Sequence, residues 1–367
     1  MSDACDACVR RAHLVARLAP RIAGMLDSAD RRTRAVLALG DDDLAQAVAG
    51  RSCDEVMAGF DVAAVRRATE AARVAAVCRH EDRFPPGLTQ LVDVPAVLFC
   101  AGDPAVLPRL AHEPAVAVVG SRRPSPYGLE MAGALGRGLA AAGVTVVSGL
   151  ALGVDAATHR GCLDASGFPV AVLAGGPDVP YPRSNRRVYA RVIERGLVLS
   201  EMPPGQRAFR WSFPARNRLM AGLAGMTVVV EAAQPSGSII TADFAQDLGR
   251  QVGAVPGRVT ARMAAGSNGL LRSGAAVIRG PEDVLDDLLG AGAGVVARAE
   301  AGRRRREALL PGLRRVLDAV EAGEGAGAIA AATRMSAREV RTALARLEAD
   351  GLVRRGPLGS YERAAEG

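Results

Sequence analysis

The sequence predicts a doubly wound α/β fold built around a mostly parallel sheet. From Val116 onward, short runs rich in β-branched residues recur. Each run is mostly apolar, and a longer Ala- and Leu-rich segment of helical character follows it. Strands of this kind, alternating with helices, are typical of a parallel sheet that is buried on both faces. The expected strands are residues 116–120, 144–148, 170–174, 197–200, 226–231, 252–255 and 276–278.

The segments on either side of this α/β domain have different patterns. Apolar residues recur at roughly helical period near the N-terminus, which predicts a helical domain there. Six prolines then punctuate a linking segment that includes a short strand at Ala96–Phe99. A Gly- and Ala-rich linker that ends in four arginines follows the sheet. The predicted segments are 1–80 (helical N-terminal domain), 81–114 (linking segment), 115–290 (α/β domain), 291–307 (linker) and 308–367 (C-terminal domain).

The C-terminal domain is expected to be a winged helix-turn-helix. Two helical segments precede Ser336, which is placed to cap a helix from Ala337 to Ala349, and Glu339 completes a capping box. Beyond Gly351, the letters LVRR, GPLG and SYER suit a hairpin, and three helices with a hairpin make a winged helix. A small three-helix tail that reads no DNA groove is the alternative.

Composition excludes several classes of protein. The 367 residues include 46 basic ones, all of them arginine, and the net charge is +7. Without lysine, the chain lacks the catalytic residue of P-loop hydrolases, kinases and Schiff-base enzymes. No apolar run approaches the length of a membrane span and no signal peptide begins the chain, so we expect a cytoplasmic protein without membrane association. The six cysteines are scattered, which suggests no disulfide framework.

Positive charge is concentrated in the middle of the chain. Residues 122–218 contain 13 arginines and 6 acidic residues. Such an excess favours a polyanion as the partner of this region. A solvated basic face without a ligand explains the same counts, so charge alone does not decide between the two.

The loops after the predicted strands carry groups that bind phosphate. In an open parallel sheet, ligands bind beyond the carboxyl ends of the strands. Glycine lets the backbone approach an anion, while hydroxyl groups, amides and helix N-termini bind it. The loops after the first and fifth strands combine these features. The residues that we assign to the site from these loops are Gly120, Ser121, Arg122, Ser236, Gly237 and Ser238.

The segment after the fourth strand, EMPPGQRAFRWSFPARNR, is the most informative one. Pro214 suits the first turn of a helix, and Arg216, Asn217 and Arg218 follow directly. Cations near the positive end of a helix repel one another unless an anion or a carboxylate neutralises them. Arginines interleaved with aromatic residues also suit contact with a single nucleic-acid strand. We therefore add Arg210, Arg216, Asn217 and Arg218 to the predicted site.

Two points in this segment stay open. Glu201 or Glu231 could neutralise the arginines in place of DNA, in which case the arginines would hold the fold together. Phe213 is expected in the core, whereas Trp211 fits either the core or a stacking surface.

Other chemistries are disfavoured. The first loop reads G-S-R-R-P-S rather than G-x-G-x-x-G, so we expect no dinucleotide cofactor. None of the four histidines pairs with a nucleophile in a recognisable motif, so we expect no catalytic residue and no enzyme activity. His159, four residues after Asp155, is expected to be a surface or core histidine.

Four residues offer an alternative metal site. Cys5 and Cys8 form half of a zinc motif, which Cys78 and His80 could complete. A lone CxxC without a second pair nearby is a weak signal. The sequence therefore predicts no metal and leaves zinc as the alternative.

Seven stretches of the chain, taken in order, resemble the DNA-processing protein A family, also called Smf. They cover the α/β domain nearly end to end, and the flanking helical and winged regions fit the layout of the family. One departure is the loop Ala174–Asp178, where family members usually have Gly-x-Gly-x-Asp. The seven stretches are VAVVGSRRPSPYG, SGLALGVDAATHRG, DVPYPRSN, SEMPPG, FPARNRLMAGLA, EAAQPSGSIITA and VPGRVTARMAAGSNGLLRSGA.

The resemblance implies a Rossmann-like fold and a role in natural transformation. Members of the family bind single-stranded DNA without sequence preference, form homodimers through the Rossmann-like domain, and load the RecA recombinase onto incoming DNA. For this chain, the resemblance implies DNA contacts from Gly120, Ser121, Arg122, Arg210 (where members often have lysine), Arg216, Asn217 and Arg218.

Two other functions are compatible with parts of the sequence. A Rossmann-like enzyme acting on nucleoside monophosphates would need a catalytic carboxylate beside the Gly-Gly loop, where GGPDVPY offers no glutamate. A ligand-sensing transcription regulator would use its winged helix on duplex DNA and would prefer duplex to single strands.

Overall fold

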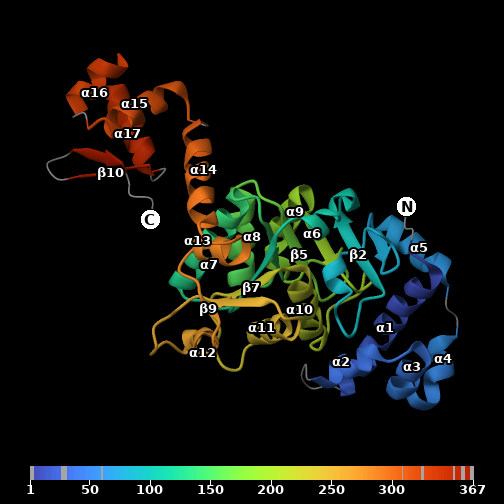
Figure 1. Cartoon of the computed structure of the whole chain (residues 1–367). Helices are drawn as coiled ribbons and strands as arrows, with labels where there is room; N and C mark the ends of the chain where they lie inside the picture. The colour runs from blue at the N-terminus through green and yellow to red at the C-terminus, as the bar shows by residue number, and fades with distance from the viewer. Residues whose placement is uncertain are drawn as a thin grey trace. The chain divides into compact units, whose positions relative to one another are not determined.

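The body of the sheet is parallel, as the sequence predicts, and helices surround it (Figure 1). It contains seven parallel strands. Each begins within one residue of its predicted start. The computed structural model describes residues 4–25, 31–58, 61–307, 309–323, 326–349, 352–356 and 360–363. The parallel strands are β3 (Ala115–Val119), β4 (Thr145–Ser148), β5 (Pro169–Val172), β6 (Leu197–Ser200), β7 (Met226–Val229), β8 (Gln251–Ala254) and β9 (Ala276–Val277).

Two antiparallel strands extend the sheet beyond β6. The first is β2 (Val97–Gly102), which matches the short strand expected at Ala96–Phe99 and pairs with β6. The second is β1 (Ala75–Cys78), which pairs with β2 and forms the edge of the sheet. The strand order is β1-β2-β6-β5-β4-β3-β7-β8-β9.

The strand order reverses its direction of growth at β3. From β3, the chain adds β4, β5 and β6 on one side, and it then returns to add β7, β8 and β9 on the other. The connections after β3 and β7 therefore diverge to opposite faces of the sheet. In doubly wound folds, the crevice that this divergence leaves beyond the carboxyl ends of the two strands is the usual ligand site.

Helices cover both faces of the parallel strands. Alternate strand residues such as Val116 and Val118 pack against one helical layer, and Ala117 and Val119 face the other. The first layer contains α7 (Pro126–Ala141), α8 (Val154–Asp164), α9 (Arg186–Arg195) and α13 (Pro281–Leu289). The second layer contains α10 (Ser212–Leu223), α11 (Gly237–Asp247) and α12 (Ala265–Arg272). The short α6 (Arg109–His112) precedes β3.

The N-terminal helices pack onto the sheet, and together they form one compact unit, residues 1–297. Val9 and Ala12 of the first helix belong to the core beside β1 and β2, whereas Leu14 and Leu18 share a core cluster with Trp211 at the start of α10. The helices are α1 (Asp6–Met25), α2 (Arg31–Ala38), α3 (Asp41–Ala49), α4 (Cys53–Met57) and α5 (Val62–Ala71).

Residues 298–367 form a second compact unit with its own core. The predicted capping box is present, because the Ser336 amide donates to Glu339 Oε2 at 2.8 Å and the Glu339 amide donates to Ser336 Oγ at 3.3 Å. Gly351 and the predicted turn at 357–359 lie outside the described residues. The elements are α15 (Pro311–Glu321), α16 (Ala326–Thr333), α17 (Ala337–Ala349), β10 (Val353–Arg355) and β11 (Tyr361–Arg363), and α14 (Ala293–Glu307) spans the boundary between the units.

Among the helices that the structure describes, none is both long and apolar enough to cross a lipid bilayer.

Candidate functional site

A pocket of about 550 Å³ opens where the strand order reverses. The loops after β3 and β7 and the first turns of α10 and α11 form its walls. Nine of the ten residues that the sequence assigns to the site line this pocket, and Arg218 is the one that does not. The nine are Gly120, Ser121, Arg122, Arg210, Arg216, Asn217, Ser236, Gly237 and Ser238.

A buried carboxylate holds the loop after β3 in place. The Ser121 amide donates to the backbone oxygen of Glu231 at 2.7 Å. The Glu231 carboxylate accepts from the Ser125 amide at 2.8 Å and from the Ser125 hydroxyl at 2.6 Å. The Ser121 hydroxyl accepts from the Arg123 amide at 3.0 Å. These bonds fix the backbone on both sides of Arg122, whose side chain is exposed.

Arg122 and two aromatic rings form one wall of the pocket. The Arg122 guanidinium lies over the Phe213 ring, 5.1 Å from its centroid. The ring of Tyr181 is 5.3 Å from the Phe213 ring and is tilted 53° to it. Tyr181 is missing from the predicted site, although the DVPYPRSN stretch that contains it follows β5 at the same edge of the sheet. The wall therefore combines a cation with two aromatic rings that line the pocket.

The N-terminus of α11 forms the opposite wall. Ser236 caps the helix, since its hydroxyl accepts from the Ser238 amide at 3.4 Å. Asn217 holds this turn by donating to the backbone oxygen of Gly237 at 2.9 Å. The hydroxyl of Thr241, one turn further on, is buried and has no hydrogen-bond partner among the described residues. This wall offers helix-end amides and hydroxyl groups, which suit an anion.

Arg216 lies at the floor of the pocket, where it is 5% exposed. Its guanidinium donates to the backbone oxygens of Gly149, at 2.9 Å, and Val172. A Cβ atom on Gly149 would come within 2.6 Å of this guanidinium, so glycine leaves room for the buried arginine in its present position. Burial lowers the pKa of Arg216 to about 10, against the opposing effect of Asp155. Arg216 is therefore charged at neutral pH, and it presents a positive floor.

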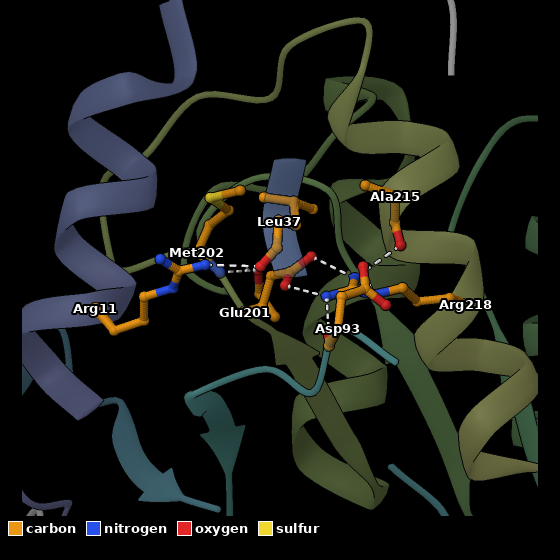
Figure 2. A network of polar contacts seen from close by, with 8 residues as sticks. Arg11, Leu37, Asp93, Glu201, Met202, Ala215 and Arg218 are labelled. Atoms are coloured by element: carbon orange, nitrogen blue, oxygen red, sulfur yellow. Dashed lines mark hydrogen bonds and ion pairs between the residues drawn. The ribbon is translucent and has the colours of Figure 1, made fainter. Parts of the chain in front are cut away.

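Arg218 does not line the pocket and lies in a buried ion-pair network (Figure 2). Its two Nη atoms donate to the two Glu201 carboxylate oxygens, each at 2.7 Å. Its Nε lies 2.8 Å from Asp93 Oδ2, in the loop before β2. Burial lowers the pKa of Arg218, but Glu201 and Asp93 outweigh burial and raise it. The sequence left open that Glu201 or Glu231 neutralises the arginines in place of DNA. For Arg218 this alternative holds, because Glu201 and Asp93 pair with it and it does not line the pocket.

The two aromatic residues at the start of α10 lie in different environments. Trp211 is 1% exposed, packs against α1, and donates from Nε1 to the Ala19 oxygen at 3.0 Å. Trp211 is thus a core residue. Phe213, expected in the core, is instead half-buried and lines the pocket. The expectation for Phe213 was wrong because the segment begins a helix, on which residues two apart point to different sides.

Asp155 and His159, which are at helical spacing on α8, are both buried. The Asp155 carboxylate accepts from the amides of Gly149, at 3.1 Å, and Ala151, at 3.3 Å. His159 is fully buried in α8, and burial lowers its pKa to about 4. His159 is thus a neutral core residue and does not line the pocket. None of the candidate zinc ligands Cys5, Cys8, Cys78 and His80 lines this pocket either.

Comparison with known sequences identifies one family. The family model described as DNA recombination-mediator protein A matches residues 75–289. A DNA processing protein DprA from Mycobacterium tuberculosis is similar to this chain, with 42% identity over 241 residues. The aligned part is 63% of this chain and spans only 61% of the length of that relative.

Two solved structures share the fold. The X-ray structure of DNA processing protein A from Streptococcus pneumoniae matches with a TM-score of 0.62 and 31% identity, covering 77% of this chain and 96% of that one. The structure of DNA processing protein A from Helicobacter pylori, which concerns its single-stranded DNA binding mode, matches with a TM-score of 0.53 and 31% identity. That match covers 59% of this chain and 96% of the other.

Proposed function

The chain belongs to the DNA recombination-mediator protein A family, and from this premise we propose that it binds single-stranded DNA without sequence preference. The relative from Helicobacter pylori binds single-stranded DNA, and it shares this fold. The pocket at the carboxyl edge of the sheet is the site that we assign to this binding.

The stacking of Arg122 on Phe213 carries the proposal. An exposed guanidinium beside two aromatic rings can bind a phosphate while the rings stack on a base. Every base has a π-face, so stacking recognises a strand without reading its sequence. A base inside a duplex is stacked on both sides, and it is not available to Phe213 or Tyr181.

The other walls suit further phosphates of the same strand. Arg210 is exposed at the rim of the pocket. Gly237, Ser238 and Thr241 line the pocket at the positive end of α11, where amides and hydroxyl groups suit an anion. Arg216 adds a buried positive charge below them. A strand that crosses the pocket therefore meets cations or donors on each side, and we propose this set as the DNA contacts.

We propose that the protein acts by binding rather than by catalysis. Among the described residues that line the pocket, Asp155 is the one carboxylate. It is buried, and it already accepts two backbone hydrogen bonds. A nucleoside monophosphate enzyme needs a carboxylate that is free to move protons. Asp178 of the GGPDVPY loop does not line the pocket. Its carboxylate oxygens accept from the Gly205 amide.

The wider role follows from the family. We propose that this chain takes part in natural transformation, that it loads the RecA recombinase onto incoming DNA in the cytoplasm, and that it acts as a homodimer. We also propose that residues 308–367 form a winged helix, since three helices precede the β10–β11 hairpin. We propose residues 1–80 as a helical N-terminal region, made of α1 to α5, whose last residues add β1 to the sheet of the same compact unit. The sheet domain, residues 115–290, supplies the DNA pocket.

Titration with oligonucleotides at several salt concentrations tests the binding function. We expect oligo-dT and a mixed-sequence single strand to bind equally. We also expect log K to fall with log salt by about 0.7 for each phosphate contacted. A duplex of the same length and adenosine monophosphate serve as competitors. Tighter binding to the duplex would favour a transcription regulator, and displacement of DNA by the mononucleotide would favour a nucleotide-binding enzyme.

A further inference from the structure

Four metal-binding side chains meet where the N-terminal helix reaches the edge of the sheet. The thiol sulfurs of Cys5 and Cys8 each lie 3.5 Å from His80 Nδ1. With the sulfur of Cys78, one ligand atom from each residue lies within 4.8 Å of every other. These residues come from two segments about seventy positions apart, so the fold rather than local sequence brings them together.

Two tight backbone features aim the four side chains at one point. Cys5 directly precedes α1 and Cys8 lies in its first turn, where the Val9 amide donates to the Cys5 oxygen at 3.0 Å. Cys78 ends β1, and the chain then turns so that the Glu81 amide donates to the Cys78 oxygen at 3.0 Å. The CxxC pair and the CxH pair are thus held by a helix start and by a strand-end turn.

We propose that Cys5, Cys8, Cys78 and His80 bind one zinc ion in a structural Cys₃His site. Around a tetrahedral zinc, a sulfur and a nitrogen ligand lie about 3.6 Å apart, and two sulfurs lie about 3.8 Å apart. The sulfur-to-nitrogen distances of 3.5 Å already fit this geometry. Three thiolates and an imidazole are soft ligands that select zinc over magnesium or calcium. Four protein ligands leave no open position, as expected for a structural site.

Two of the cysteines outside the cluster show a contrast with it. Cys100 and Cys162 are buried among apolar side chains, as small apolar residues commonly are. The proposed site instead includes an exposed histidine and a half-exposed cysteine, Cys5. Neither would be needed to fill a core.

The zinc would join two parts of the fold. Cys5 and Cys8 belong to the start of α1, and Cys78 and His80 lie at the end of β1, the edge strand of the sheet. The ion would fasten the N-terminal helix to that strand. Three thiolates and Zn²⁺ leave one negative charge, which Arg79, between two of the ligands in sequence, can offset.

Metal analysis of the full-length protein tests the proposal. Protein purified without chelator and dialysed against metal-free buffer should contain about one zinc per chain. Cobalt(II) added to the stripped protein should produce thiolate-to-cobalt charge-transfer absorption. Cys5→Ser should abolish both signals. Cys53→Ser is the matched control, because Cys53 is another half-exposed cysteine outside the cluster, and this variant should keep the zinc.

A second variant covers the case in which Cys5→Ser misfolds. His80→Cys, at an exposed position, converts the site to four thiolates and should keep zinc with a stronger cobalt charge-transfer band. The proposal is overturned if the folded wild-type protein neither retains zinc nor binds cobalt. It is also overturned if Cys5→Ser folds and holds as much zinc as the wild type.

Discussion

Arg218 and Glu201 form two parallel hydrogen bonds of 2.7 Å each inside the protein, from the two Nη atoms to the two carboxylate oxygens. Asp93 closes the network on Nε at 2.8 Å. Arg218→Ala would leave the carboxylates of Asp93 and Glu201 inside the protein without the cation that neutralises them. Breaking a buried pair in this way typically costs about 3–5 kcal/mol, so we expect urea unfolding at pH 7 to show a loss of that order.

The control for this prediction is Arg279→Ala, which removes an exposed arginine that lies just before α13 and pairs with Asp283 in the first turn of that helix. It should move the unfolding midpoint very little, because exposed pairs contribute little to stability. Arg218→Ala protein that remains folded should keep nearly wild-type affinity for oligo-dT. Unchanged stability together with a large loss of affinity would show that Arg218 contacts DNA after all.

Arg122 should behave in the opposite way. It is exposed, and its charge lowers the pKa of the buried Arg216, after the larger effect of burial, so its removal relieves a repulsion. We expect Arg122→Ala to be as stable as wild type and to bind oligo-dT roughly 10- to 150-fold more weakly, the equivalent of one charge-assisted hydrogen bond. Arg123→Ala, at the next exposed position but outside the pocket, is the matched control. Equal losses in the two variants would mean a diffuse charge effect.

The aromatic wall makes a separate prediction about base stacking. Tyr181→Leu should weaken binding to oligo-dT by about 1–3 kcal/mol, because it removes one stacking surface. The loss should persist at high salt, since stacking involves no counterion release. Tyr127→Leu is the control, because Tyr127 is a comparably exposed tyrosine outside the pocket. If the Tyr181→Leu defect disappeared at high salt, the ring would have no stacking role.

His159 predicts a decline of stability in mild acid. Burial lowers its folded-state pKa to about 4 from an ordinary value of 6.5. Between these pH values the unfolded chain binds a proton that the folded chain does not, so stability falls as pH drops from about 6.5 towards 4. The loss is of the order of 3 kcal/mol. In urea titrations from pH 7 to 5, His159→Gln should show a flatter dependence on pH than wild type. Identical slopes would contradict this assignment.

The second compact unit should contribute little to single-strand binding. Every described residue of the pocket lies between 119 and 263, within the first unit. A chain ending at Glu307 should therefore keep its affinity for oligo-dT within about tenfold of wild type. A loss of two orders of magnitude, about 2.7 kcal/mol, would move the main contact to residues 308–367.

The sheet and the position of the pocket could be predicted from sequence for a simple reason. A strand buried on both faces is apolar at most positions, so runs such as VAVVG at 116–120 stand out without any knowledge of tertiary contacts. The site then follows from topology, since loops after parallel strands gather at one edge. The sequence predicts that Gly120 and Ser236 lie at the same edge of the sheet even when the order of the strands is not known.

The error over Arg218 has a physical origin that the sequence could have exposed. Residues two apart on a helix point about 200° apart, so Arg216 and Arg218 could not both face the pocket from α10. A local sequence pattern does not reveal which distant residue pairs with Arg218 or Trp211. Asp93 lies 125 positions earlier in the chain. The oxygen of Ala19 that holds Trp211 lies 192 positions earlier.

Trp211 is the one tryptophan of the chain. It is wedged between α1 and the helix that lines the pocket, with Arg210 before it and Phe213 two residues after it. The protein therefore carries a single intrinsic fluorophore at the junction that a DNA-induced movement of α10 would disturb. Its emission should lie in the blue range of an enclosed indole. If α1 and α10 moved apart, water would reach the indole and the emission maximum of Trp211 would shift to the red. This measurement needs no added fluorescent label.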